Sequence, residues 1–277
     1  MGVLNVPDAQ LYYETRGTGP LLIMIPGASG DARTFTAVSR YLEEHYTVIT
    51  YDRRGFSRSP LDGPQDYHHR LTTDADDVAR LIEHHGESAA VFGTSSGAVI
   101  ALTVLPRHPN RVSSLAVYEP AAMTLLPDSA GEIEFVEYLY ELYRSQGVVA
   151  AQKAFQERNL SRADRRFLTG APNSNTEHHH ANATYWFERE LRQYSTAQLD
   201  MDSLRHYAER VALLAGEQSR GCPTHRVGAE LGRAIGRDVI ETPGGHLACG
   251  SNPAEFSRSL RHALTRRAGT TSLNVPE

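Results

Sequence analysis

Residues 91–100 (VFGTSSGAVI) constrain the fold of this chain more than any other stretch. Apolar residues lead into the segment and apolar residues leave it, as expected for a short buried strand that turns directly into a buried helix. The turn has the spacing G-x-S-x-G, formed by Gly93, Ser95 and Gly97. Such a turn crowds its apex, and glycines two residues before and after it remove the Cβ atoms that would clash. The pattern therefore predicts that Ser95 is held out at the carboxyl end of a sheet.

A hydroxyl in this position has a chemical use. The backbone N–H of Ser96 opens the helix, where N–H groups are unpaired and the helix dipole favours an anion. An exposed hydroxyl beside such an N–H is what acyl transfer requires. The five-residue spacing alone also fits a loop that ends in a helix N-cap, but the flanking strand and helix favour a nucleophile. The rest of the chain must then supply a base, an acid and a second oxyanion donor.

The composition limits the class of protein. The chain has 277 residues and a net charge of −5, with acidic and basic residues interspersed, so no nucleic-acid or membrane partner is expected. Its two cysteines, Cys222 and Cys249, offer neither a disulfide framework nor zinc spacing. The N-terminus lacks the pattern of a signal peptide, and no apolar run approaches the roughly 20 residues of a membrane span. We expect a cytoplasmic protein, and leave open whether it is a homodimer.

Strand and helix patterns alternate along most of the chain, which favours a parallel sheet with right-handed crossovers. Apolar or β-branched runs predict eight strands, at residues 3–6, 11–14, 21–25, 46–51, 89–92, 113–118, 211–215 and 238–241. Amphipathic spacing predicts helices at residues 34–45, 71–85, 224–235 and 253–266, besides the helix that follows Ser95. The expected class is α/β.

The alternation is interrupted at residues 121–205, where no strand pattern is found and helices are predicted at 132–144, 148–159 and 185–194. This segment contains the only tryptophan, Trp186. It is predicted to be a helical insertion in a core formed by residues 1–120 and 206–268, with a polar tail at 269–277. Two interpretations remain open: an ordinary helical subdomain with its own core, or a lid whose aromatic face walls a pocket.

Three loops that follow predicted strands carry further sequence motifs. Residues 26–28 (PGA) follow the third strand, residues 52–59 (DRRGFSRS) follow the fourth, and residues 243–246 (PGGH) follow the last. Together with the turn at Ser95 and the helical insertion, and in this order, they resemble an α/β-hydrolase over nearly the whole chain. The resemblance implies a mostly parallel eight-stranded sheet flanked by helices, with a helical lid inserted after strand 6.

The resemblance also implies roles for individual residues. His246 is the expected general base, which takes the proton of Ser95 and returns it to the leaving group. The oxyanion donors are the backbone N–H groups of Ser96 and Ala28. Three further side chains are candidates for substrate contacts: Ser29, Thr94 and Trp186.

The acid is less clear, because the usual family position, just past the strand at 211–215, falls on Ser219. A serine carries no charge to hold an imidazolium. Glu119 ends the strand at 113–118, which comes after the helix that follows Ser95. It is favoured as the acid, since adjacent parallel strands end side by side. Some α/β-hydrolases that this arrangement resembles, such as haloalkane dehalogenases and fungal zearalenone lactonases, carry their acid at that strand end. Glu217 is the alternative, and a site without a conventional acid is the third possibility.

The expected activity is hydrolysis of a carboxylic ester or lactone through an acyl-enzyme, with a Ser-His-Glu triad and a small apolar or aromatic substrate. No cofactor is implied. No metal is expected either, because the consecutive histidines 178–180 point in different directions on any regular element. Two other classes remain open, since the fold alone does not determine function. One is a non-hydrolytic enzyme such as a cyclase, lyase or cofactor-free perhydrolase, and the other is a small-molecule receptor that retains the triad.

Overall fold

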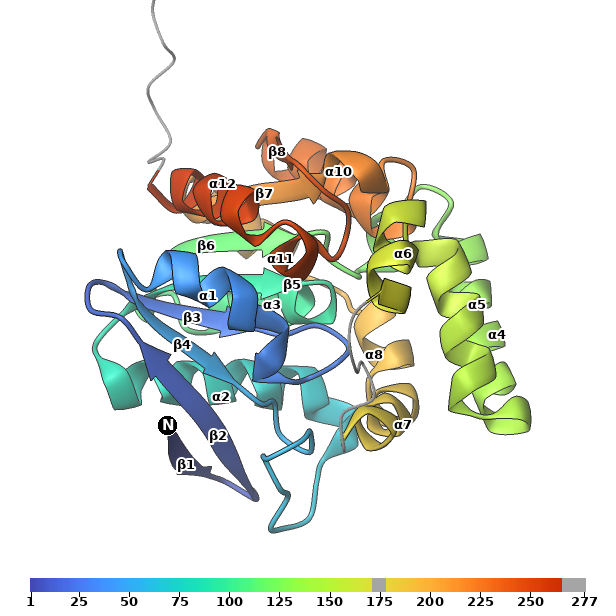
Figure 1. The fold of residues 1–277 in the computed structure, drawn as a ribbon, viewed down its shortest axis with the longest axis horizontal. Helices are drawn as coiled ribbons and strands as arrows, with labels where there is room; N and C mark the ends of the chain where they lie inside the picture. Colours follow the sequence, from blue (N-terminus) through green and yellow to red (C-terminus); the bar gives the residue numbers. More distant parts are fainter. Residues whose placement is uncertain (171–177, 266–277) are drawn as a thin grey trace, which may run out of the picture.

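The computed structural model describes residues 1–170 and 178–265, and its centre is an eight-stranded sheet with the strand order β1-β2-β4-β3-β5-β6-β7-β8 (Figure 1). The strands are β1 (Gly2–Val6), β2 (Ala9–Arg16), β3 (Leu21–Ile25), β4 (Thr47–Tyr51), β5 (Ala89–Thr94), β6 (Val112–Tyr118), β7 (Val211–Gly216) and β8 (Val239–Thr242). The pairs β1–β2 and β2–β4 are antiparallel, and the other five are parallel. The predicted mostly parallel sheet is thus confirmed.

Helices occupy the connections between the strands of the core and follow the last strand. They are α1 (Thr36–Leu42), α2 (Arg70–His85), α3 (Ser96–Arg107), α10 (Pro223–Ile235), α11 (Ala248–Ser251) and α12 (Pro253–Thr265). Short 3-10 turns precede or follow several of these elements: η1 (Ala32–Phe35), η2 (Tyr67–His69), η4 (Ala208–Arg210) and η5 (Glu217–Ser219).

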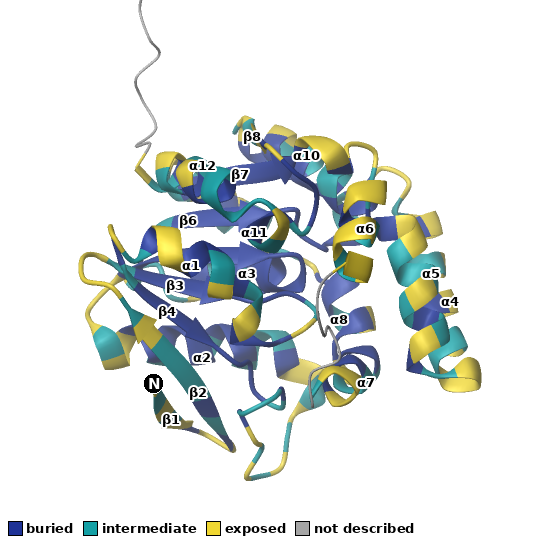
Figure 2. Ribbon diagram, in the orientation of Figure 1, coloured by how far each residue is buried: buried dark blue, intermediate teal, exposed yellow. Residues whose placement is uncertain are grey.

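The two faces of the sheet pack against different helices. Ile23 and Ile25 of β3 belong to a buried cluster with residues of α2, α3 and α10. The alternate residues Leu22 and Met24 belong to a second cluster with residues of α1, α11 and α12. Figure 2 shows the central strands as buried. Because both faces are covered, the inner strands are continuous apolar runs, which is why the sequence identifies them well.

Between β6 and β7 the described part of the chain forms helices and no strand. These are η3 (Met123–Leu125), α4 (Ser129–Gln146), α5 (Val148–Asn159), α6 (Arg162–Gly170), α7 (His179–Arg189), α8 (Leu191–Ser195) and α9 (Met201–His206). In Figure 1, α4 to α8 stand beside one end of the sheet. Leu139, Trp186 and Phe187 form an apolar cluster there, which also includes Phe56 from the loop after β4. The insertion therefore has a core of its own and packs that core onto the sheet's carboxyl edge.

The helices of the insertion depart from the prediction at one informative point. The single helix expected at 185–194 is divided into α7 and α8 at Glu190, which has a φ of −126° and is buried. Its carboxylate binds Arg53 and Arg70 of the core. The break thus coincides with a long-range ion pair that local helical periodicity does not reveal. The short helices α6, α9 and α11 were likewise not predicted, because few apolar residues mark them.

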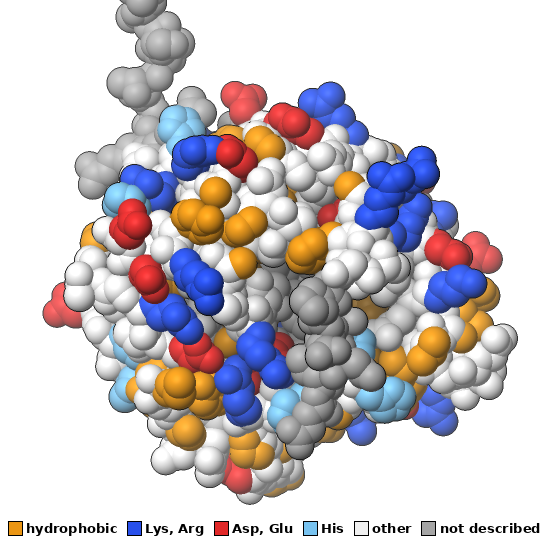
Figure 3. Space-filling view, viewed as in Figure 1, with side chains coloured by type: hydrophobic (Ala, Val, Ile, Leu, Met, Phe, Trp, Pro, Cys, Tyr) orange, Lys and Arg blue, Asp and Glu red, His pale blue; other side chains and the backbone are white. Residues whose placement is uncertain are grey.

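The surface in Figure 3 carries basic and acidic side chains interspersed, in keeping with the small net charge. Within residues 1–170 and 178–265, no helix combines the length and the apolar character needed to cross a bilayer. The predicted polar tail at 269–277 lies outside the described residues.

Candidate active site

Ser95 stands at the apex of the turn between β5 and α3, as the sequence predicts. Its φ of 54° and ψ of −121° place a non-glycine residue in a sparsely populated backbone region, which is common where a side chain is presented for function. A Cβ atom on Gly93 would lie 2.3 Å from the carbonyl oxygen of Gly97, and one on Gly97 would lie 2.3 Å from that of Ile25. Both glycines are therefore required by close backbone contacts on either side of the serine.

Glu119 lies beside Ser95 because their strands are neighbours in register. Thr94 is paired with Tyr118, so that Ser95 and Glu119 are the first residues past two adjacent strand ends. Ser95 N–H donates to the carbonyl oxygen of Tyr118 at 3.0 Å, which locks the two ends together. Glu119 also has a positive φ, 46°, and its side chain is fully buried.

The carboxylate of Glu119 binds His246. His246 Nδ1 lies 2.5 Å from Glu119 Oε2, although the two residues are 127 positions apart. The other carboxylate oxygen accepts hydrogen bonds from the backbone N–H of Gly216, at 2.9 Å, and from the hydroxyl of Ser219. Thr224 Oγ1 is 3.3 Å from Glu119 Oε2 and 3.4 Å from His246 Nδ1. These contacts fix the position of both members of the pair.

The charges of the pair stabilise each other. Burial alone lowers the pKa of His246, but the hydrogen bond and charge of Glu119 outweigh it and raise that pKa above its ordinary value. Burial raises the pKa of Glu119, and the contacts with His246, Ser219 and Gly216 outweigh this and bring that pKa below its ordinary value. Glu119 is thus held ionised next to an imidazole that can accept a second proton.

Ser219, which occupies the position past β7 where the family resemblance led us to expect the acid, donates to Glu119. The alternative acid, Glu217, is exposed on η5, and within the described residues its side chain has no hydrogen bond or ion pair. Glu217 therefore does not contact His246, and of the two carboxylates considered, Glu119 is the one that does.

The loop after β3 lies against the serine. A Cβ atom on Gly27 would be 3.0 Å from Ser95 Cβ. The carbonyl oxygen of Gly27 accepts a hydrogen bond from Arg53 Nη2 at 2.9 Å, which fixes the peptide unit that carries the Ala28 N–H. In the described part of the chain, neither Ala28 N–H nor Ser96 N–H is a donor to another protein group. Two N–H groups near Ser95 are therefore available to an oxyanion.

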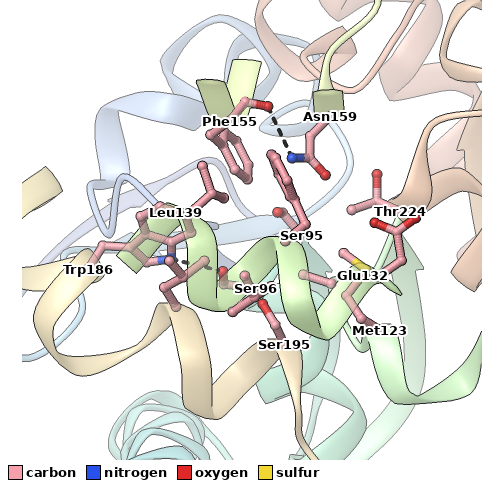
Figure 4. A pocket seen from close by; sticks show the side chains of 14 residues that line it. Ser95, Ser96, Met123, Glu132, Leu139, Phe155, Asn159, Trp186, Ser195 and Thr224 are labelled. Atoms are coloured by element: carbon pink, nitrogen blue, oxygen red, sulfur yellow. Dashed lines mark hydrogen bonds between the residues drawn. The ribbon is translucent and has the colours of Figure 1, made fainter. Parts of the chain in front are cut away.

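A cavity opens in front of Ser95 (Figure 4). It is lined by core residues and by the insertion: Ser95, Ser96, Ala121, Met123, Glu132, Phe135, Val136, Leu139, Phe155, Asn159, Trp186, Leu191, Ser195 and Thr224. Of the three predicted substrate contacts, Trp186 is in this wall and its Nε1 lies 3.4 Å from Ser96 Oγ. Ser29 and Thr94 do not line the cavity. The hydroxyl of Ser29 is hydrogen-bonded to that of Thr34, and Thr94 is the last residue of a buried strand.

Asp164 of α6 is a site residue that the sequence did not reveal. Its carboxylate accepts hydrogen bonds from the backbone N–H groups of His246, at 3.1 Å, and Leu247, at 2.9 Å. A Cβ atom on Gly245 would lie 2.3 Å from Asp164 Oδ2, so the glycine makes room for this carboxylate. Ser161 and Asp164 form a capping box at the start of α6, a signal that the expected helices above did not use, and its spacing gives no sign of the contact with the histidine loop.

The serine and the histidine are not hydrogen-bonded to each other in this part of the structure. Among the described residues no hydrogen bond joins Ser95 Oγ to His246, whose Nδ1 is engaged by Glu119. In free enzymes such contacts are often long and tighten only when substrate binds.

Within residues 1–170 and 178–265, the structure brings together no group of three or more potential metal ligands, and residues 178–180 do not form one. Cys249, three residues past His246, packs in the core, and burial raises the pKa of its thiol well above the ordinary value.

Comparison with known proteins agrees with this fold. A model of the alpha/beta hydrolase family matches residues 22–259. The chain is 32% identical over 273 residues to an uncharacterized hydrolase, YraK, of Bacillus subtilis, covering 96% of both proteins. It is 30% identical over 113 residues to the zearalenone hydrolase of Bionectria ochroleuca, covering 39% of this chain and 42% of that protein. The solved enol-lactonase of Burkholderia xenovorans LB400 has the same fold, with a TM-score of 0.73 at 19% identity, over 96% of this chain and 100% of that one.

Proposed function

The chain belongs to the alpha/beta hydrolase family, and from this premise we propose that it is a serine hydrolase that cleaves a carboxylic ester or a lactone. One observation carries the proposal: a buried carboxylate, Glu119, binds Nδ1 of His246 at 2.5 Å and lies at the strand end next to Ser95. This is the arrangement of an acid that orients a base beside a nucleophile.

In the proposed reaction, Ser95 Oγ attacks the carbonyl carbon while its proton passes to Nε2 of His246. Glu119 holds the proton on Nδ1 and stabilises the imidazolium that forms. The N–H groups of Ala28 and Ser96 bind the oxyanion of the tetrahedral intermediate. When the intermediate collapses, His246 returns the proton to the departing alcohol oxygen. Water, deprotonated by His246, then cleaves the acyl-enzyme and restores Ser95.

We further propose that the helical insertion acts as a lid. The cavity in front of Ser95 has a volume of about 20 Å³, which is room for about one water molecule. An ester or lactone is larger, so helices of the insertion must move to admit it. The apolar and aromatic side chains that these helices contribute, such as Phe135, Phe155 and Trp186, favour an apolar or aromatic substrate.

The test is covalent labelling with a fluorophosphonate, with the adduct located by mass spectrometry. We expect labelling at Ser95 and none in Ser95→Ala. Glu119→Gln should slow labelling by about a hundredfold or more, because its amide no longer stabilises the imidazolium. Glu217→Gln is the matched control and should label like the wild type, since Glu217 is exposed and away from His246.

A wild-type protein that is folded but not labelled would refute an activated serine. Labelling without turnover of any ester or lactone in a broad panel would instead point to a non-hydrolytic enzyme or a receptor. Slower labelling in Glu217→Gln than in Glu119→Gln would contradict the assignment of the acid.

A further inference from the structure

The wall of the cavity contains polar groups that the proposed reaction does not use. Besides Ser95, the polar lining residues include Ser96, which contacts Trp186, and Thr224, which contacts the Glu119–His246 pair. The remaining three are Glu132 of α4, Asn159 of α5 and Ser195 of α8. All three belong to the insertion and each is at most 6% exposed. They are set among apolar and aromatic side chains, where an unpaired polar group is costly.

Asn159 presents an acceptor to the cavity. Its Nδ2 donates to the carbonyl oxygen of Phe155 at 3.0 Å, which fixes the orientation of the amide. Figure 4 shows the amide oxygen turned away from that bond. Within the described residues neither this oxygen nor the hydroxyl of Ser195 has a hydrogen-bond partner. Neither atom is among the fully enclosed polar atoms that lack a partner, so both are open to the cavity, where a donor on the ligand can pair with the amide oxygen.

Glu132 presents a second acceptor, already oriented. Arg158 donates to its two carboxylate oxygens at 2.9 and 3.2 Å, and Arg226 lies 3.5 Å away. An ionised carboxylate can only accept hydrogen bonds, so it disfavours another anion. The two guanidinium groups compensate its charge, and a ligand cation would repel them. A neutral hydroxyl group satisfies both conditions, because it donates without adding charge.

We propose that Glu132 and Asn159 form a subsite that recognises a hydroxyl group, so that the substrates are esters or lactones whose apolar body carries a hydroxyl. This inference rests on the proposed hydrolase function, and it narrows the class of substrate. The hydroxyl donates to the carboxylate of Glu132 or to the amide oxygen of Asn159, and can accept from Ser195. A substrate without that hydroxyl leaves the amide oxygen of Asn159 without a donor and displaces water from it, which is an effective way of rejecting that substrate.

The test compares matched esters with and without a hydroxyl, in both halves of the molecule. One pair is p-nitrophenyl butyrate and p-nitrophenyl β-hydroxybutyrate, and the other is benzyl butyrate and meta-hydroxybenzyl butyrate. We expect the wild type to show a kcat/KM about tenfold or more higher for the hydroxylated member of at least one pair. In Asn159→Leu this ratio should fall towards one, because an acceptor is removed, and in Glu132→Gln it should fall by less, because the charge is lost but the amide oxygen still accepts.

Glu134→Gln is the control, since Glu134 is exposed on the same helix, and it should keep the wild-type ratio. Thermal unfolding of each variant verifies that it is folded. Labelling of wild-type Ser95 together with equal kcat/KM in both pairs would overturn the subsite and leave the hydrolase function standing. Unchanged ratios in both folded variants would overturn the assignment to Glu132 and Asn159. Absence of both labelling and turnover would overturn the proposed function and, with it, the subsite.

Discussion

At the scale of single residues, the site depends on a few positions with unusual constraints. Ser95 and Glu119 both have positive φ values and both directly follow a buried strand. Their side chains leave the sheet at adjacent strand ends, where the backbone N–H of each residue still donates to the neighbouring strand, Ser95 to Tyr118 at 3.0 Å and Glu119 to Leu214 at 3.2 Å. The strain is tolerated because the neighbouring strands fix both ends.

Gly93 and Gly97, the glycines on either side of Ser95, give a prediction about stability. Gly97→Ala places a Cβ atom 2.3 Å from the carbonyl oxygen of Ile25, and backbone on both sides must shift to accommodate it. We expect the free energy of unfolding to fall by at least about 2 kcal/mol, measured by urea denaturation. Gly131→Ala on α4 is the matched control. A Cβ atom there has no neighbour within 4 Å, so a gain of up to about 1 kcal/mol is expected. Equal stability of the two variants would contradict the requirement for glycine at position 97.

The Glu119–His246 pair gives a prediction about pH. His246 must be neutral to act as a base, so labelling of Ser95 falls as the pH drops through the pKa of His246. Glu119 raises that pKa and burial lowers it, so in Glu119→Gln the pKa should fall. The acidic limb of the pH–rate profile for labelling should therefore move to lower pH, although the rate is reduced throughout. Glu217→Gln should leave the limb in place. A limb that stays fixed or moves to higher pH in Glu119→Gln would show that the carboxylate does not set the pKa.

At the scale of elements, the insertion does more than cover the cavity. Helix α6 reaches the histidine loop through Asp164, and a Cβ atom on Gly250 would lie 3.2 Å from the ring of Phe167 on the same helix. Between α7 and α8 of the insertion, Glu190 binds Arg53, which in turn binds the carbonyl oxygen of Gly27. The loops that carry His246 and Ala28 are thus both tied to helices inserted between β6 and β7.

Asp164 is therefore expected to position the base. Asp164→Asn replaces one acceptor by an N–H donor that faces the backbone N–H of His246 or Leu247. We expect kcat to fall by about tenfold with little change in KM, since a small displacement of a catalytic group mainly slows chemistry. Labelling of Ser95 should slow by the same factor. Asp202→Asn, at an exposed position on α9, should resemble the wild type. A rise in KM with unchanged kcat would show that Asp164 shapes the pocket and does not position the histidine.

At the scale of the whole molecule, a buried ion-pair network joins the insertion to the sheet. Arg53 is fully buried and binds both Glu190, at 2.7 Å, and Asp74 of α2, at 3.1 Å. Arg70 binds the same glutamate at 3.0 Å. The network therefore connects the loop after β4, helix α2 and the junction of α7 with α8. Arg53 stands in the loop after β4, and its partner Glu190 is 137 residues away in the sequence.

Breaking this network from one side should cost much more than breaking a surface pair. Glu190→Gln leaves two buried guanidinium groups with Asp74 as the anion they still share, and we expect a loss of about 3–5 kcal/mol in the free energy of unfolding. Glu137→Gln, which removes an exposed partner of Arg192, should cost no more than about 1 kcal/mol. Urea denaturation of both variants gives the comparison. Similar losses in the two would show that the buried network does not hold the insertion to the core.

The sequence by itself determined the local structure and much of the site. Glycine spacing identified the elbow at Ser95, continuous apolar runs identified the inner strands, and the order of the loops singled out His246. It also favoured Glu119, because neighbouring parallel strands end at the same edge of a sheet. Each of these signals depends on residues close together in the chain or on a rule of sheet topology, and can therefore be recognised in the sequence alone.

Only the tertiary structure decided which groups meet across long separations. It brings Glu119 to His246 across 127 residues and Asp164 to the same loop across 82, and it leaves Glu217 on the surface. It also selects Trp186, Glu132 and Asn159 for the cavity wall. Local periodicity records which face of a helix is buried, but not which distant element covers that face. The partners of Glu119 and His246, and the side chains around the cavity, are therefore defined only when the helices of the insertion are packed against the sheet.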